Sequence, residues 1–66
     1  MRVSINGETQ TIETGVTIAR LLTQLGLNQR RIAVEVNRAI IPREAYGAHA
    51  LVDNDEVEIV QFVGGG

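Results

Sequence analysis

The dipeptide Asn6-Gly7 constrains the fold of this 66-residue chain more than any other local feature. Before it, apolar and polar residues alternate over 2–5 at the period-two spacing of a β-strand. Asn-Gly tolerates the two positive φ angles of a type I′ turn, which joins hairpin strands through two residues. The sequence therefore predicts an N-terminal β-hairpin, with its second strand over 10–13 and Ile12 facing inward.

A helical period follows the hairpin. Four apolar residues recur at the i, i+3, i+4, i+7 spacing of one helix face: Ile18, Leu21, Leu22 and Leu25. Thr17 is placed to cap the start of this helix, and Gly26 suits the left-handed position just after its end. We expect one helix of two to three turns.

The remainder of the chain is mostly extended. Alternating residues predict strands over 32–36 and 56–62, with a short extended piece at 40–41 between them. A single helical turn is expected at 42–46 and a tight turn at 53–55. One short helix can cover only one face of a sheet. The predicted fold class is therefore α+β, a mixed four- to five-stranded sheet packed on one main helix.

Composition excludes several kinds of function. Without Cys and with His49 as the only His, the chain offers neither a disulfide scaffold nor structural zinc, and no metal site is expected. A net charge of −2 without a basic stripe argues against nucleic acid. No apolar run is long enough to cross a membrane, so a soluble chain is expected, and a cytoplasmic location is taken as the default. The only serine, Ser4, alternates outward, which argues against a Ser-His-Asp triad.

The end of the sequence is the most distinctive candidate site. We expect a folded domain over 1–63 and a flexible glycine tail over 64–66. The outward face of the last strand changes from charged to apolar just before the tail, so Val60 and Phe62, with Val63, are predicted to dock a partner. Glycines lack Cβ and enter slots that admit only backbone.

A carboxylate at Gly66 would be ionised at neutral pH and a poor electrophile. A partner that converts it to an acyl adenylate would open an unhindered glycyl carbonyl to a sulfur or amine nucleophile. Such chemistry is performed on the chain, which is then not itself an enzyme. The simpler interpretation of the three glycines is a frayed terminus.

The stretches "IAVEVN", "IIPR" and "DNDEVEIVQFVGGG" resemble the ThiS family of sulfur carriers of thiamine (thiazole) biosynthesis, over the whole chain. The resemblance implies a ubiquitin-like β-grasp fold, shared with MoaD/ThiS-like proteins. It implies that an E1-like, ThiF-like adenylyltransferase uses ATP and magnesium to adenylate Gly66, the chain itself binding no cofactor. A cysteine desulfurase or similar donor then supplies sulfur for a thiocarboxylate, which a ThiG-like thiazole synthase consumes. Gly64 and Gly65 form the tail that enters the partner.

Asn54 departs from the glycine usual in the Asp-Gly-Asp turn of such carriers, although asparagine also tolerates a left-handed backbone. Three other functions stay open at the level of sequence. The chain could be the small subunit of molybdopterin synthase, a ubiquitin-like modifier of other proteins, or a plain binding module.

Overall fold

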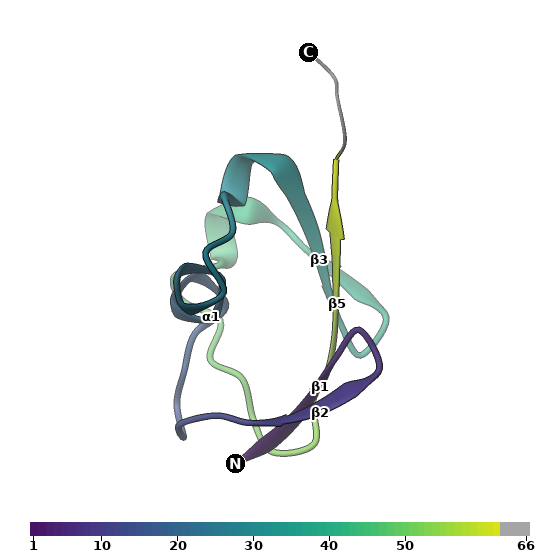
Figure 1. Cartoon of the computed structure of the whole chain (residues 1–66). Helices are drawn as coiled ribbons and strands as arrows, with labels where there is room; N and C mark the ends of the chain where they lie inside the picture. The colour runs from purple at the N-terminus through teal and green to yellow at the C-terminus, as the bar shows by residue number, and fades with distance from the viewer. Residues whose placement is uncertain (63–66) are drawn as a thin grey trace.

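The computed structural model describes residues 1–62 and shows one mixed sheet with one α-helix against it (Figure 1). Val63 and the tail predicted at 64–66 lie outside the described residues. In chain order the elements are β1 Arg2–Ile5, β2 Glu8–Thr11, α1 Ile18–Gln24, β3 Ile32–Val36, β4 Ala39–Ile41 and β5 Glu56–Gln61, with 3₁₀ turns at Gln29–Arg31 and Arg43–Ala45.

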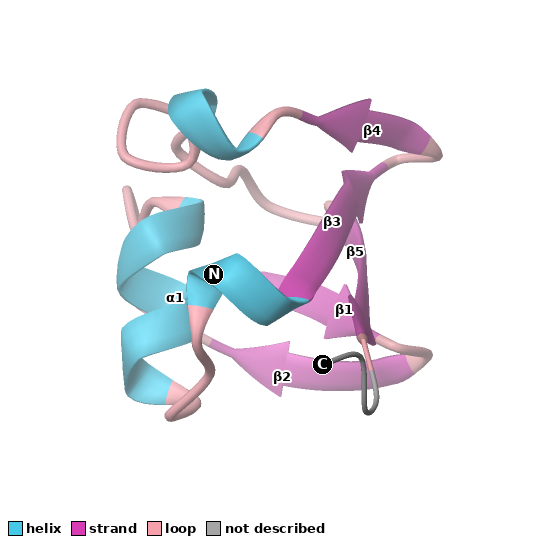
Figure 2. Cartoon of the chain, turned by 90° about the horizontal axis from the view of Figure 1, so that it is seen from above, coloured by secondary structure: helices cyan, strands magenta, loops and turns pink. Residues whose placement is uncertain are grey.

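The sheet has five strands in the order β2-β1-β5-β3-β4, which Figure 2 shows from above. β1 and β5 pair in parallel, and every other neighbouring pair is antiparallel. β5 is the central strand, and it joins the two hairpins. The predicted mixed sheet on one main helix is confirmed.

The N-terminal hairpin turns where the sequence predicts, with φ of +50° at Asn6 and +85° at Gly7. The two-residue turn pairs Ile5 directly with Glu8. For this reason the second strand spans Glu8–Thr11, and the predicted range 10–13 was wrong. Ile12, predicted to face inward, is half-buried beyond the strand's end.

Helix α1 has the caps that its sequence predicts. The Thr17 side chain accepts the N–H of Arg20 at 3.2 Å. At the other end Gly26 adopts a φ of +72°, and its N–H and that of Leu27 bond to carbonyls of the last turn at 3.0 and 2.9 Å. This is a Schellman motif, which satisfies carbonyls that the helix leaves without a partner.

One predicted member of the helix's apolar stripe was misplaced. Leu25 is the C-cap of α1 and keeps 45% of its surface exposed, because the helix ends at Gln24 before a third turn forms. The other three stripe residues are buried. They pack in a core with residues of the sheet, of the segment before α1 and of the segment before β5: Val16, Ile32, Val34, Val36, Tyr46, Leu51, Val57 and Ile59.

The start of β5 is fixed by a polar network around Asp55, the one buried charged residue among those described. Asn37 and Arg38, with φ of +52° and +71°, form the two-residue turn between β3 and β4. The Asn37 side chain donates to Asp55 and accepts from the N–H of Glu56, both at 2.9 Å. The other Asp55 oxygen accepts from the N–H of Val52 at 2.9 Å. Because buried polar groups are costly unless paired, this network holds the β3–β4 turn against the beginning of β5.

Candidate functional site

The two faces of β5 differ, as the alternation of its sequence predicts. Val57 and Ile59 are buried beneath α1, whereas Glu58 and Val60 lie on the opposite face. We call that face, which α1 leaves uncovered in Figure 1, the outer face of the sheet. Phe62 follows β5 and keeps 58% of its surface exposed, and Val60 keeps 57%. The prediction that these two apolar side chains point to solvent is confirmed, and their role in docking stays a prediction.

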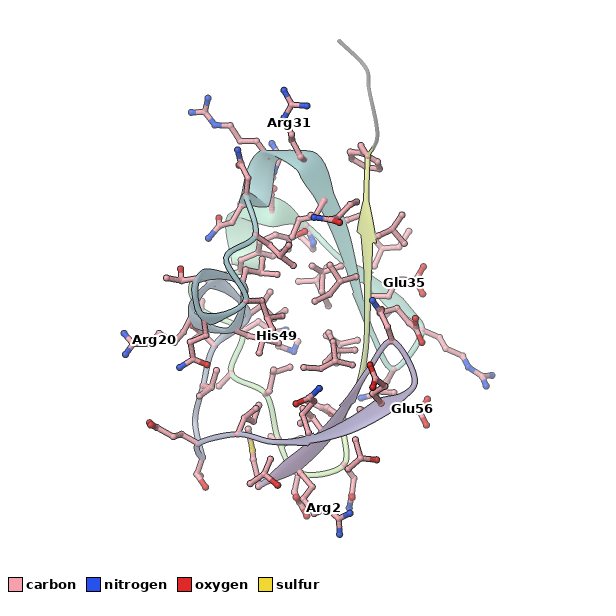
Figure 3. The ribbon with its side chains drawn as sticks, in the orientation of Figure 1. Arg2, Arg20, Arg31, Glu35, His49 and Glu56 are labelled. Atoms are coloured by element: carbon pink, nitrogen blue, oxygen red, sulfur yellow. The ribbon has the colours of Figure 1, made fainter. Side chains whose placement is uncertain are left out.

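The outer face carries apolar and acidic residues side by side. Val60 lies opposite Ala33 of β3, and Glu58 lies opposite Glu35. Glu35 in turn lies opposite Ile40 of β4, which is 76% exposed. Large apolar side chains left this open on a small domain are typical of a surface that a partner covers. Figure 3 shows Glu35 on this side of the sheet, away from α1.

Arginines gather at the end of the molecule where β5 finishes. The N–H of Phe62 bonds to the carbonyl of Arg31 at 2.8 Å, which places Arg31 beside the last described residue of the chain (Figure 3). Arg30 precedes it, and the Arg43 guanidinium donates to the Arg30 carbonyl at 3.3 Å. The end of β5 therefore lies between a basic rim and an acidic outer face. Charge contrasts of this kind orient charged partners in protein association generally.

On the side that faces β1, a side chain rather than a strand supports the C-terminal half of β5, whose other side pairs with β3. The amide of Asn6 donates to the carbonyl of Ile59 at 3.2 Å and accepts from its N–H at 2.7 Å. The Asn6 side chain thus makes both of the bonds to Ile59 that a longer β1 would make. It does so at the point where the hairpin has turned away from β5. This clamp holds the strand that leads into the tail, and sequence reasoning missed it because Asn6 was assigned only a turn role.

The described residues contain neither a cluster of metal-ligating side chains nor a membrane-spanning helix. Within residues 1–62 no group of three or more His, Cys, Asp or Glu side chains could hold a metal ion. His49 is half-buried, and its carbonyl accepts the N–H of Ile18 at 3.0 Å, which gives it a structural place beside α1. No helix in this part of the chain is long and apolar enough to cross a membrane.

The residue predicted to react, Gly66, lies outside the described part of the chain. So do Gly64 and Gly65 of the predicted tail and the predicted docking residue Val63. The structure describes the strand that precedes them and the surface beside it. The candidate site is therefore the C-terminal end of β5 with its outer face.

A five-stranded mixed sheet of this order with one main helix on a single face is the ubiquitin-like β-grasp fold. The chain superimposes on the crystal structure of the thiamine biosynthesis protein ThiS from Geobacter metallireducens with a TM-score of 0.86 and 33% identity, covering 100% of both chains. The model of the ThiS family matches residues 3–66. The chain belongs to the ThiS family.

Two curated relatives differ in length. The sulfur carrier protein ThiS of Escherichia coli K12 is 32% identical over 66 residues, covering 100% of each protein. A thiazole synthase of Magnetococcus marinus is 42% identical over 66 residues, which is 100% of this chain but 20% of that protein. The chain thus spans about a fifth of the length of this second relative.

Proposed function

We propose that this chain is a sulfur carrier of thiamine biosynthesis whose C-terminal Gly66 is the reacting residue. The observation that carries the proposal is the exposed apolar end of β5, with Val60 and Phe62 open to solvent immediately before Val63 and the three glycines, in a member of the ThiS family. A partner that binds this end of the strand has the glycines within reach of its active site.

The proposed activation is an acyl transfer carried out by an E1-like adenylating enzyme. The Gly66 carboxylate attacks the α-phosphorus of ATP, and magnesium pyrophosphate leaves. A hydrosulfide equivalent that originates from cysteine then attacks the glycyl carbonyl carbon, and AMP leaves. The product is a thiocarboxylate at Gly66, whose sulfur a thiazole synthase takes into the thiazole ring.

In this scheme the chain supplies the recognised surface and the acyl group, and its partners supply the catalysis. ATP and magnesium belong to the activating enzyme, and no cofactor is assigned to this chain. Val60, Phe62 and Val63 would form the docking contact, and the arginine rim would orient it. We place this exchange in the cytoplasm.

The relative from Magnetococcus marinus supports the choice of acceptor. A protein named thiazole synthase contains a region 42% identical to this entire chain. Domains that occur in one polypeptide are held at high effective concentration. The same two modules on separate chains would need a docking surface to meet, and the exposed end of β5 provides one.

The test is activation by the adenylating enzyme, followed as ATP–pyrophosphate exchange. We expect exchange with the full chain and none with a chain that lacks Gly66, while both unfold at nearly the same temperature. Exchange at the full rate by the shortened chain would show that Gly66 is not the site. After activation, thiazole formation with thiazole synthase is expected, whereas sulfur transfer only to the large subunit of molybdopterin synthase would contradict the assigned pathway.

A further inference from the structure

A groove lies next to the end of β5, on the helix side of the sheet and therefore opposite its outer face. Its floor is apolar and comes from three elements: Ile5 of β1, Ile59 of β5, and Leu25 and Leu27 after α1. Its rim is polar, formed by Asn6, Glu8, Gln10 and Gln61. The groove exists because α1 ends at Gln24 and leaves this end of the sheet uncovered.

The backbone of Gln61 forms an open strand edge along this groove. Alternate residues of a strand point their N–H and C=O groups to the same side. Those of Ile59 point to the β1 side, where Asn6 binds both, and the N–H of Phe62 points to β3. The N–H and C=O of Gln61 therefore point to the β1 side too, and no described residue bonds to either.

The open edge results from the length of β1. This strand pairs with β5 only at Ser4↔Glu56 and Ile5↔Val57, and then the hairpin turns away. The Asn6 clamp extends the bonding along β5 by two residues, from Val57 to Ile59. In Figure 1, β5 continues beyond the β1–β2 hairpin towards the C-terminus. None of the described strands pairs with Gln61 on the β1 side.

The chemistry of the groove favours one kind of occupant. An N–H and a C=O side by side on a strand edge are satisfied together by another extended backbone, as in β-strand addition. The volume of about 310 Å³ lies at the lower end of small-molecule pockets, and it suits one or two side chains. Leu25, which is 45% exposed, offers an apolar contact to a side chain in the groove. The carboxylate of Glu8 would pair with a basic side chain there.

We propose that an extended segment of thiazole synthase adds to the edge of β5 at Gln61 and places an apolar side chain in this groove. The choice of thiazole synthase rests on the proposed function. Strand addition fixes the direction of a bound backbone through its ladder bonds. A partner that binds β5 in this way would fix the direction in which the chain leaves the strand.

Two substitutions test the edge itself. Gln61→Pro removes the N–H that faces the groove, and proline is tolerated at a strand edge. Gln61→Ala is the matched control, since it removes the side chain and keeps the N–H. By calorimetric titration with thiazole synthase, we expect Gln61→Pro to raise the dissociation constant about five- to tenfold. Gln61→Ala should raise it less than about twofold. Thermal melting confirms that each variant is folded.

Leu25→Gln tests the groove independently of the edge, because Leu25 lines the groove but is not part of β5. It also lies away from the outer face of the sheet. Its expected effect is again about five- to tenfold weaker binding. In amide spectra of the labelled wild-type chain, the Gln61 N–H and the groove residues should shift on addition of thiazole synthase.

The outcomes separate the two proposals. If wild type binds thiazole synthase, but Gln61→Pro and Leu25→Gln bind equally well and shifts occur only around Val60 and Phe62, the groove proposal is wrong and the proposed function stands. If wild type binds no thiazole synthase at all, both are wrong. Selective weakening by the two variants, with Gln61→Ala unaffected, supports strand addition.

Discussion

Replacing Asn6 measures how strongly its side chain holds the strand that leads into the tail. Asn6→Gly keeps the positive φ of the turn and removes both bonds to Ile59, of 2.7 and 3.2 Å. Each such bond contributes a net ~0.5–1.5 kcal/mol, so the free energy of unfolding should fall by about 1–3 kcal/mol. For a domain of this size that lowers the melting temperature by roughly 5–20 °C.

A second substitution and a control divide this loss. Asn6→Ala removes the same bonds and forces a Cβ into the left-handed region, which costs about 1–2 kcal/mol, partly offset by the lower entropy of the unfolded chain. It should therefore be less stable than Asn6→Gly by about 1 kcal/mol. The control is Asn54→Gly, because Asn54 also has a positive φ, +71°, but makes no side-chain hydrogen bond to a described residue.

Urea denaturation of the four chains is the assay. Asn54→Gly should stay within about 0.5 kcal/mol of wild type, as surface substitutions do. If Asn6→Gly is as stable as Asn54→Gly, the amide clamp contributes nothing and the reasoning about β5 is refuted. Equal stability of Asn6→Gly and Asn6→Ala would refute only the argument about the backbone.

Further substitutions test the outer face of β5, the polar network and the helix cap. Val60→Asp and Phe62→Asp should each weaken binding to the adenylating enzyme roughly tenfold in titration, with little loss of stability. The control Val52→Asp, also at an exposed apolar residue, should bind normally. Unfolding of the Val60 or Phe62 variant would instead show that these residues belong to the core. Asp55→Ala leaves the N–H of Val52 without its partner and should lower the unfolding free energy in urea by about 2–4 kcal/mol, and wild-type stability would disprove the network. Gly26→Ala meets no atom within 4 Å, so its cost of about 1 kcal/mol comes from the left-handed backbone alone, and a stabilised variant in thermal melting would contradict this.

The local elements of this fold follow closely from residue patterns. Asn6-Gly7, Thr17 and Gly26 each act through their own backbone or through partners three or four residues away, and the structure has them as predicted. The alternation in β5 likewise determines which side chains are buried, because one face of the sheet is covered and the other is open. Patterns of this kind depend on short-range geometry, which a single sequence contains.

The features that escaped prediction depend on residues far apart in the chain. The bonds of Asn6 to Ile59 cross 53 positions, and those of Asn37 cross 18 and 19. Nothing local distinguishes an asparagine that clamps another strand from one that merely tolerates a turn. Leu25 was misassigned for a different, local reason. The apolar pattern includes Leu25, but α1 already ends at Gln24, ahead of the left-handed Gly26.

The candidate site divides in the same way. The exposed side chains of Val60 and Phe62 could be predicted from parity alone. The arginine rim and the groove could not, because loops and strand ends from different parts of the chain build them. The open edge at Gln61 depends on where β1 stops relative to β5, which is a matter of register.

The most direct test of the central claim is the mass of the intact chain. It would be incubated with the adenylating enzyme, ATP, magnesium and a sulfur source derived from cysteine, with a chain that lacks Gly66 alongside. The account predicts a mass increase equal to the replacement of one oxygen by one sulfur, located in the C-terminal peptide and absent from the shortened chain. An unchanged mass, under conditions in which the same enzyme charges the Escherichia coli sulfur carrier protein ThiS, would contradict it.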